Sequence, residues 1–141
     1  MATKRGNIAM IIKFKIIHVI FFMLLFQPIL YGATNKKTIM IDLDGVLNNY
    51  TSYTKEIPSI KKGAKDFVKT LSADYELILF TSRNSKQATQ WLERNEIDTY
   101  FKNVTNVKYP AYIYIDDRSL KFDGDYTKTL EKIENFDIYW K

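Results

Sequence analysis

The fold of this 141-residue chain is decided by the stretch Thr38-Ile39-Met40-Ile41-Asp42-Leu43-Asp44-Gly45. Residues 38–43 form a short, mostly apolar run that predicts a β-strand. Asp42 and Asp44 stand two positions apart at its end, so their side chains project to the same side, and Gly45 then permits a sharp turn. Two such carboxylates repel each other unless a cation or a shared proton relieves them, which favours Mg²⁺ with its oxygen ligands. A turn that uses Asp and Gly for shape alone is the alternative.

The rest of the chain alternates between β-like runs and helical spacing, which is typical of a parallel α/β sheet. We predict further strands at 75–81, 103–105 and 112–115, and a final edge strand at 136–140. The spacing of apolar residues predicts three helices. The first begins after Gly63, and the second has Ser85 as its N-cap. Their inward-facing residues are Ala64, Phe67, Val68 and Leu71, then Ala88, Trp91 and Leu92, and then Leu130 and Ile133. Residues 46–62 form a loop rich in Asn, Tyr, Thr and Ser.

Polar residues follow the other predicted strands where each strand ends. Asp116 and Asp117 come directly after four apolar residues, which is an expensive place for charge without a partner. They are expected at the carboxyl edge of the sheet near Asp42, where open α/β sheets bind ligands. The Thr81 hydroxyl is placed to hold a phosphoryl oxygen at the start of a helix, although helix capping by Thr81, Ser82 or Ser85 is the favoured explanation when Thr81 is taken alone. Lys108 is placed to neutralise the carboxylates and to hold a phosphate, although a Lys before Tyr-Pro is by itself more often an exposed loop residue.

Charge and composition exclude several kinds of site. The chain has no Cys and a single His, His18, so disulfides, Cys-ligated zinc, iron–sulfur clusters and a Cys nucleophile are excluded. The net charge of +5 is uneven, because six of the 21 Lys and Arg and none of the 16 Asp and Glu lie in residues 1–37. Residues 38–141 carry fifteen bases against sixteen acids and are therefore nearly neutral.

The sequence predicts that residues 1–37 are a basic and apolar extension and that residues 38–141 form the domain. Lysines 13 and 15 precede an apolar run at 16–26, and small residues follow at 32–33, which is the pattern of a signal peptide. If uncleaved, residues 10–33 are long enough to anchor the chain in a membrane. The alternative is a start codon assigned too far upstream, with Met10 as another start, and a cytoplasmic domain. His18 lies inside the apolar run and is therefore not expected to be catalytic.

The ordered set Asp42-Leu43-Asp44-Gly45, Thr81, Lys108 and Asp116-Asp117 resembles the four motifs of the haloacid dehalogenase-like hydrolase superfamily. The similarity covers residue 38 to the end of the chain, and Tyr114-Ile115-Asp116-Asp117-Arg118 resembles its small, capless members. The resemblance implies a Rossmann-like three-layer sandwich with a parallel central sheet. Loop 46–62 and residues 105–112 are too short to hold a large cap domain.

The resemblance also implies a role for each motif residue. Asp42 would be the nucleophile and a Mg²⁺ ligand, and Asp44 the general acid and base, with its backbone carbonyl on the metal. Thr81, Ser82 and Lys108 would hold the phosphoryl oxygens. Asp116 would bind Mg²⁺ directly, and Asp117 directly or through water. An acid at the Asp44 position favours a phosphatase over a dehalogenase.

The leading prediction is therefore a Mg²⁺-dependent phosphomonoesterase that uses an aspartyl-phosphate intermediate and acts on a small phosphorylated substrate. A nucleic-acid 3′-phosphatase or nucleotidase is a second prediction, disfavoured by the nearly neutral domain, because backbone binding needs a basic patch. A catalytically silent binding module on the same fold is the third, and the complete motif set argues against it. Tyr50 and Tyr53 are predicted to pack on the surface or to form a small flap. Arg83 and Arg118 are predicted to form exposed salt bridges rather than substrate contacts.

Overall fold

The computed structural model of the chain describes residues 35–140, which belong to one unit. The predicted signal or anchor segment, with residues 10–33 and His18, lies outside the described residues. Within residues 35–140, no helix combines the length and the apolar character that crossing a membrane requires.

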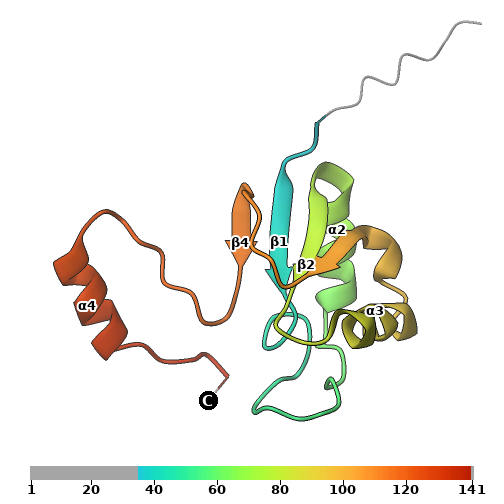
Figure 1. Cartoon of the computed structure of the whole chain (residues 1–141), viewed down its shortest axis with the longest axis horizontal. Coiled ribbons are helices and arrows are strands. Elements are labelled where there is room, and N and C mark those ends of the chain that lie inside the picture. Colours follow the sequence, from blue (N-terminus) through green and yellow to red (C-terminus); the bar gives the residue numbers. More distant parts are fainter. Residues whose placement is uncertain (1–34, 141) are drawn as a thin grey trace, which may run out of the picture. The chain divides into compact units, whose positions relative to one another are not determined.

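The fold is a four-stranded parallel sheet with helical connections, as the sequence predicts (Figure 1). The strands lie in the order β3-β2-β1-β4, so β2 and β3 lie on one side of β1 and β4 lies on the other. β1 therefore takes a central position, paired in parallel with β2 and with β4. The strands are β1 (Thr38–Asp42), β2 (Glu76–Phe80), β3 (Phe101–Thr105) and β4 (Ile113–Ile115).

Three α-helices and one 3-10 turn connect and follow these strands. They are α2 (Ala64–Asp74), α3 (Ser85–Arg94), the turn η1 (Asp98–Tyr100) and α4 (Tyr126–Glu134). The connection from β1 to α2 is a loop fastened by an isolated bridge between Asn48 and Ile60. The α/β fold without a large cap is thus confirmed for the part of the chain that the structure describes.

The hydrophobic core lies between one face of the sheet and the helices α2 and α3. Ile39 and Ile41 of β1 and Leu77 and Leu79 of β2 are buried in this core, because alternate residues of a strand share a face. The helical residues Val68 of α2 and, in α3, Ala88, Trp91 and Leu92 join it, as their spacing predicts, whereas Phe67, also predicted to face inward, is exposed. This packing fixes β1 firmly and so fixes the position of Asp42 at its end.

The N-cap of α3 is Asn84 rather than the predicted Ser85. The Asn84 side chain accepts a hydrogen bond from the Gln87 backbone N–H at 3.2 Å. Both residue types cap helices well, so the choice depends on the backbone, which leaves helical geometry at Asn84.

The predicted edge strand at 136–140 is wrong, because this segment has no strand structure. Tyr139 and Trp140 instead reach the acidic end of the sheet. The Tyr139 hydroxyl donates to the backbone carbonyl of Gly45, and the Trp140 indole N–H donates to Asp117. The preceding helix α4 forms as predicted, but its Leu130 and Ile133 are exposed and add nothing to the core.

Candidate active site

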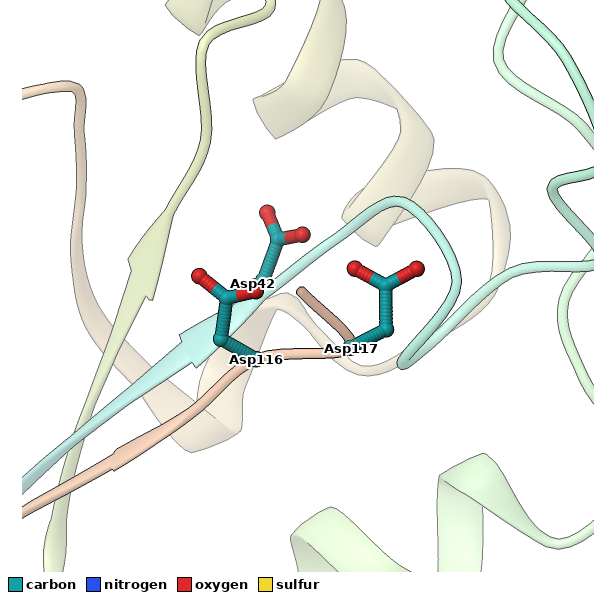
Figure 2. Close-up of side chains that lie close together, drawn as sticks. All are labelled: Asp42, Asp116 and Asp117. Atoms are coloured by element: carbon teal, nitrogen blue, oxygen red, sulfur yellow. The ribbon is translucent and has the colours of Figure 1, made fainter. Parts of the chain in front are cut away.

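The carboxyl ends of β1 and β4 bring three aspartates together, as Figure 2 shows. Asp42 ends β1, whereas Asp116 and Asp117 follow β4, its direct neighbour in the sheet. One carboxylate oxygen from each lies within 4.8 Å of the other two. This spacing and the all-oxygen donor set fit a hard divalent cation such as Mg²⁺.

Burial and crowding make Asp42 an unusual carboxyl group. Burial, and to a smaller extent the charges of Asp116, Asp117 and Asp44, raise the pKa of Asp42 from its ordinary value of 3.8 to about 7. A hydrogen bond from the Leu43 backbone N–H, at 2.8 Å, opposes these effects and favours the charged form. The crowded carboxylates therefore favour a bound cation, which would offset their mutual repulsion.

A pocket of about 510 Å³ opens above this cluster. It brings together six of the seven residues that the sequence motifs single out: Asp42, Asp44, Thr81, Ser82, Asp116 and Asp117. The other lining residues are Tyr50, Phe80, Asn106 and Arg118. Acids and hydroxyls thus line a shared space of a size that suits a small ligand.

Asp44 is held by two side chains, one on each carboxylate oxygen. The Asn48 amide donates to Oδ1 at 2.7 Å, and Nε of Arg83 donates to Oδ2 at 2.7 Å. Asn48 is fully buried, and its own side-chain oxygen accepts a hydrogen bond from the Gly45 backbone N–H. The Asp44 carboxylate in the turn after β1 is therefore fixed in direction as well as in position.

Thr81 and Ser82 follow β2 directly, and both line the pocket. Thr81 is 3% exposed, and its backbone N–H bonds to the carbonyl of Thr105 on β3. Its hydroxyl oxygen accepts a hydrogen bond from the Arg83 backbone N–H at 3.2 Å. Sheet pairing thus holds Thr81 rigidly at the edge that carries the acids.

Lys108 lies outside the pocket lining in this conformation. Its Nζ sits over the ring of Tyr114, 4.3 Å from the centroid, in a cation–π contact. Asn106, two residues earlier in the same connection, lines the pocket instead. The predicted role of Lys108 in holding phosphate stays a prediction.

Several residues at the site carried no distinctive sequence signal. Asn106 lies in a loop without a recognisable motif, and Trp140 lies in a segment predicted to be a strand. Arg83, predicted to be an exposed salt-bridge residue, forms a salt bridge whose arginine side chain is only 4% exposed. Arg118 lies on the pocket wall beside the rings of Tyr50 and Trp140. A polar residue just after a strand end was the one usable signal for Arg83 and Arg118.

The comparisons with known proteins agree with this fold. A conserved protein from Bacteroides thetaiotaomicron has a solved structure that matches with a TM-score of 0.51 and 22% sequence identity. The match covers 72% of this chain and 92% of that one, and it supports the fold. A search of curated proteins finds no match.

A family model provides the assignment of activity. The model for the NLI interacting factor-like phosphatases matches residues 37–138, nearly the whole described part of the chain. That range begins just before β1 and includes every motif residue at the pocket. The expectation of a small haloacid dehalogenase-like hydrolase is thereby confirmed. The chain belongs to the NLI interacting factor-like phosphatase family and is a haloacid dehalogenase-like phosphoric monoester hydrolase.

Proposed function

We propose that this chain hydrolyses a small phosphomonoester in a Mg²⁺-dependent reaction that passes through an aspartyl-phosphate on Asp42. The observation that carries the proposal is that the cluster of Asp42, Asp116 and Asp117 lines the same pocket as Thr81 and Ser82. A phosphoryl group bound in this pocket would meet a nucleophile, a cation site and hydrogen-bond donors at once.

The chain's own carboxylates would hold the metal. Asp42, Asp116 and Asp117 offer oxygens that lie within 4.8 Å of one another, and the Asp44 backbone carbonyl would add a fourth ligand. When bound, Mg²⁺ would offset the negative charge of the phosphate and stabilise the transition state. Thr81 and Ser82 would orient the phosphoryl oxygens, and Lys108 would swing from Tyr114 to join them.

The proposed reaction has two steps, formation of the aspartyl-phosphate and its hydrolysis. An oxygen of Asp42 attacks phosphorus, the ester P–O bond breaks, and Asp44 gives a proton to the leaving oxygen. Water next attacks the phosphorus of the aspartyl-phosphate while Asp44 takes its proton. The bond between phosphorus and Asp42 breaks, which releases inorganic phosphate and restores the carboxylate. His and Cys are not needed, which agrees with their absence from residues 38–141.

The test is turnover of para-nitrophenyl phosphate with and without Mg²⁺. We expect activity that EDTA removes and Mg²⁺ restores, and that Asp42→Asn abolishes. Asp66→Asn is a matched control, because Asp66 is an exposed acid on α2. Brief incubation with ³²P-labelled substrate should label the wild-type chain in an acid-stable, alkali-labile form. Mg²⁺-independent turnover, or full activity in Asp42→Asn, would refute the proposal.

A further inference from the structure

Arg83 is a nearly buried cation that connects two parts of the site. It lies between β2 and α3, and its side chain is only 4% exposed. An arginine is seldom buried to this extent without a specific partner. Its Nη2 is buried and has no hydrogen-bond partner in the described part of the chain. Unpaired buried donors are uncommon and concentrate where function constrains a structure, so Arg83 calls for an explanation beyond packing.

The first connection is to the carboxylate of Asp44, 39 positions earlier. Arg83 Nε donates to Asp44 Oδ2 at 2.7 Å, while the Asn48 amide holds the other oxygen. The two donors together define the plane in which the carboxylate lies. Because Asn48 belongs to the same turn as Asp44, Arg83 is the contact that orients this carboxylate relative to the end of β2.

The second connection is to the loop between β1 and α2. Arg83 Nη1 donates to the backbone carbonyl of Thr54 at 2.5 Å. The rings of Tyr50 and Tyr53 flank the guanidinium, with centroids 5.9 Å and 5.3 Å from its central carbon. Tyr50 also lines the pocket. One guanidinium therefore fixes both the carboxylate and a loop segment that forms part of the pocket wall.

Direct binding of substrate is not the role that this geometry supports. Arg83 is absent from the pocket lining, and its Nε and Nη1 donate to Asp44 and to the loop. The exposed arginine on the pocket wall is Arg118. An effect of Arg83 on the reaction would therefore act through Asp44 and the loop.

We propose that Arg83 is a positioning residue that aims the Asp44 carboxylate at the leaving-group oxygen and couples it to residues 50–54 of the loop. The inference rests on the proposed function, in which Asp44 protonates that oxygen. Arginine suits this task because its planar fork contacts two acceptors in fixed relative directions. Lysine keeps the charge but presents a single nitrogen and cannot reproduce both contacts.

The leaving group distinguishes orientation of the acid from general support of the fold. An alkyl phosphate releases a basic alkoxide that needs a proton, whereas 2,4-dinitrophenyl phosphate releases a phenolate that needs none. General acid catalysis contributes about 10²- to 10⁴-fold. Arg83→Ala should therefore lower kcat/KM about 10- to 100-fold for an alkyl phosphate and less than about 3-fold for the dinitrophenyl ester.

The experiment measures kcat/KM for alkyl, phenyl and dinitrophenyl phosphates in the full chain with Mg²⁺. The variants are Arg83→Ala, Arg83→Lys, Asp44→Asn and the double variant of Arg83→Ala with Asp44→Asn. Arg94→Ala is the matched control, because Arg94 is an exposed arginine on α3. We expect both Arg83 variants to show the leaving-group dependence of Asp44→Asn, and the double variant to lose no more than Asp44→Asn alone.

Limited trypsin digestion tests the coupling to the loop without any substrate. Lys55 is exposed and adjoins Thr54, so loss of the Arg83 contact should speed cleavage after Lys55 in Arg83→Ala and not in Arg94→Ala. Unchanged cleavage would overturn the coupling. Equal loss of kcat/KM for all three esters, or full restoration by lysine, would overturn the positioning role and leave the phosphatase proposal standing. A wild-type chain that hydrolyses none of the esters would overturn both.

Discussion

The indole N–H of Trp140 donates a hydrogen bond to the Asp117 carboxylate, 23 positions earlier in the chain. The Asp117 side chain is 2% exposed, and the Arg118 guanidinium lies 3.8 Å from the same oxygen. The C-terminal segment thus supports a residue of the candidate metal site, although it belongs to no strand or helix. Residues that orient metal ligands commonly change metal affinity by about 10- to 100-fold when they are replaced.

Replacing Trp140 by Phe should therefore weaken Mg²⁺ binding. The variant keeps an aromatic ring but loses the donor, so Asp117 retains its position less firmly. We expect the Mg²⁺ concentration for half-maximal activity to rise by about 10-fold, within the range found for such supporting contacts. The control is Tyr126→Phe, which removes one hydroxyl from a residue that is 78% exposed. Unchanged Mg²⁺ dependence in Trp140→Phe would show that Asp117 is positioned without the indole.

Gly45 should tolerate no side chain. Its φ of +80° favours glycine, and a Cβ there would collide with the Asp117 carboxylate and approach Trp140 Nε1 to 3.0 Å. Gly124 has a similar φ of +91° but open space around its Cα, so Gly124→Ala carries the backbone cost alone. We expect Gly45→Ala to lower the melting temperature and phosphatase activity well beyond Gly124→Ala. Equal effects would mean that the contact with Asp117 is relieved without loss.

The stability of the metal-free chain should fall as pH rises from about 4 to about 7. The pKa of Asp42 is about 7 in the folded chain, against an ordinary value of 3.8, so the folded state binds the extra proton between these values. The free energy of unfolding therefore decreases with rising pH in this window, and ionised Asp42 remains destabilising above it. Thermal unfolding in EDTA should show this trend as a difference between wild type and Asp42→Asn.

Mg²⁺ should have the opposite pH dependence. Because the cation binds the ionised carboxylates, it should raise the melting temperature more at pH 8 than at pH 5. Asp116→Asn should reduce that increase by removing one of the three clustered oxygens. A stabilisation by Mg²⁺ that is equal at both pH values would contradict the assignment of these carboxylates as ligands.

Lys108→Ala tests whether Lys108 leaves Tyr114 when substrate binds. If its Nζ joins the phosphoryl group, the variant should lower kcat/KM by about 10²- to 10³-fold, as loss of a charge-stabilising donor does. Lys102→Ala is the control, because Lys102 forms only a surface ion pair with Glu76 on the neighbouring strand. Wild-type activity in Lys108→Ala would indicate that Thr81, Ser82 and Asn106 hold the phosphoryl group without it.

The sheet and its acidic edge could be predicted because local patterns determine them. Alternating apolar residues such as Ile39 and Ile41 mark a strand with a buried face, and parallel strands place their ends at one edge. Asp42 and Asp116 follow such runs directly, so their meeting follows from the order of the strands. The inner face of α3 was predictable for the same reason, since Ala88, Trp91 and Leu92 keep helical spacing.

The contacts that fix the acids could not be predicted, because they join residues far apart in sequence. Nothing local marks Arg83 as the partner of Asp44, and arginine after a strand is most often a surface residue. The segment 136–140 has the composition of a strand, yet Tyr139 hydrogen-bonds to Gly45 after β1 and Trp140 to Asp117 after β4. Such tertiary contacts override a local β preference.

The placement of β1 between β2 and β4 also has a consequence for hydrogen exchange. Asp42 belongs to a strand with a neighbour on each side, whereas Asp116 and Asp117 follow a three-residue strand at the edge of the sheet (Figure 1). Amides of β4 should therefore exchange with solvent sooner than those of β1, and the acidic cluster should come apart before the central strand opens. A divalent cation held by all three carboxylates would link the edge strand β4 to the central strand β1. Its binding should slow exchange in β4 far more than in β1.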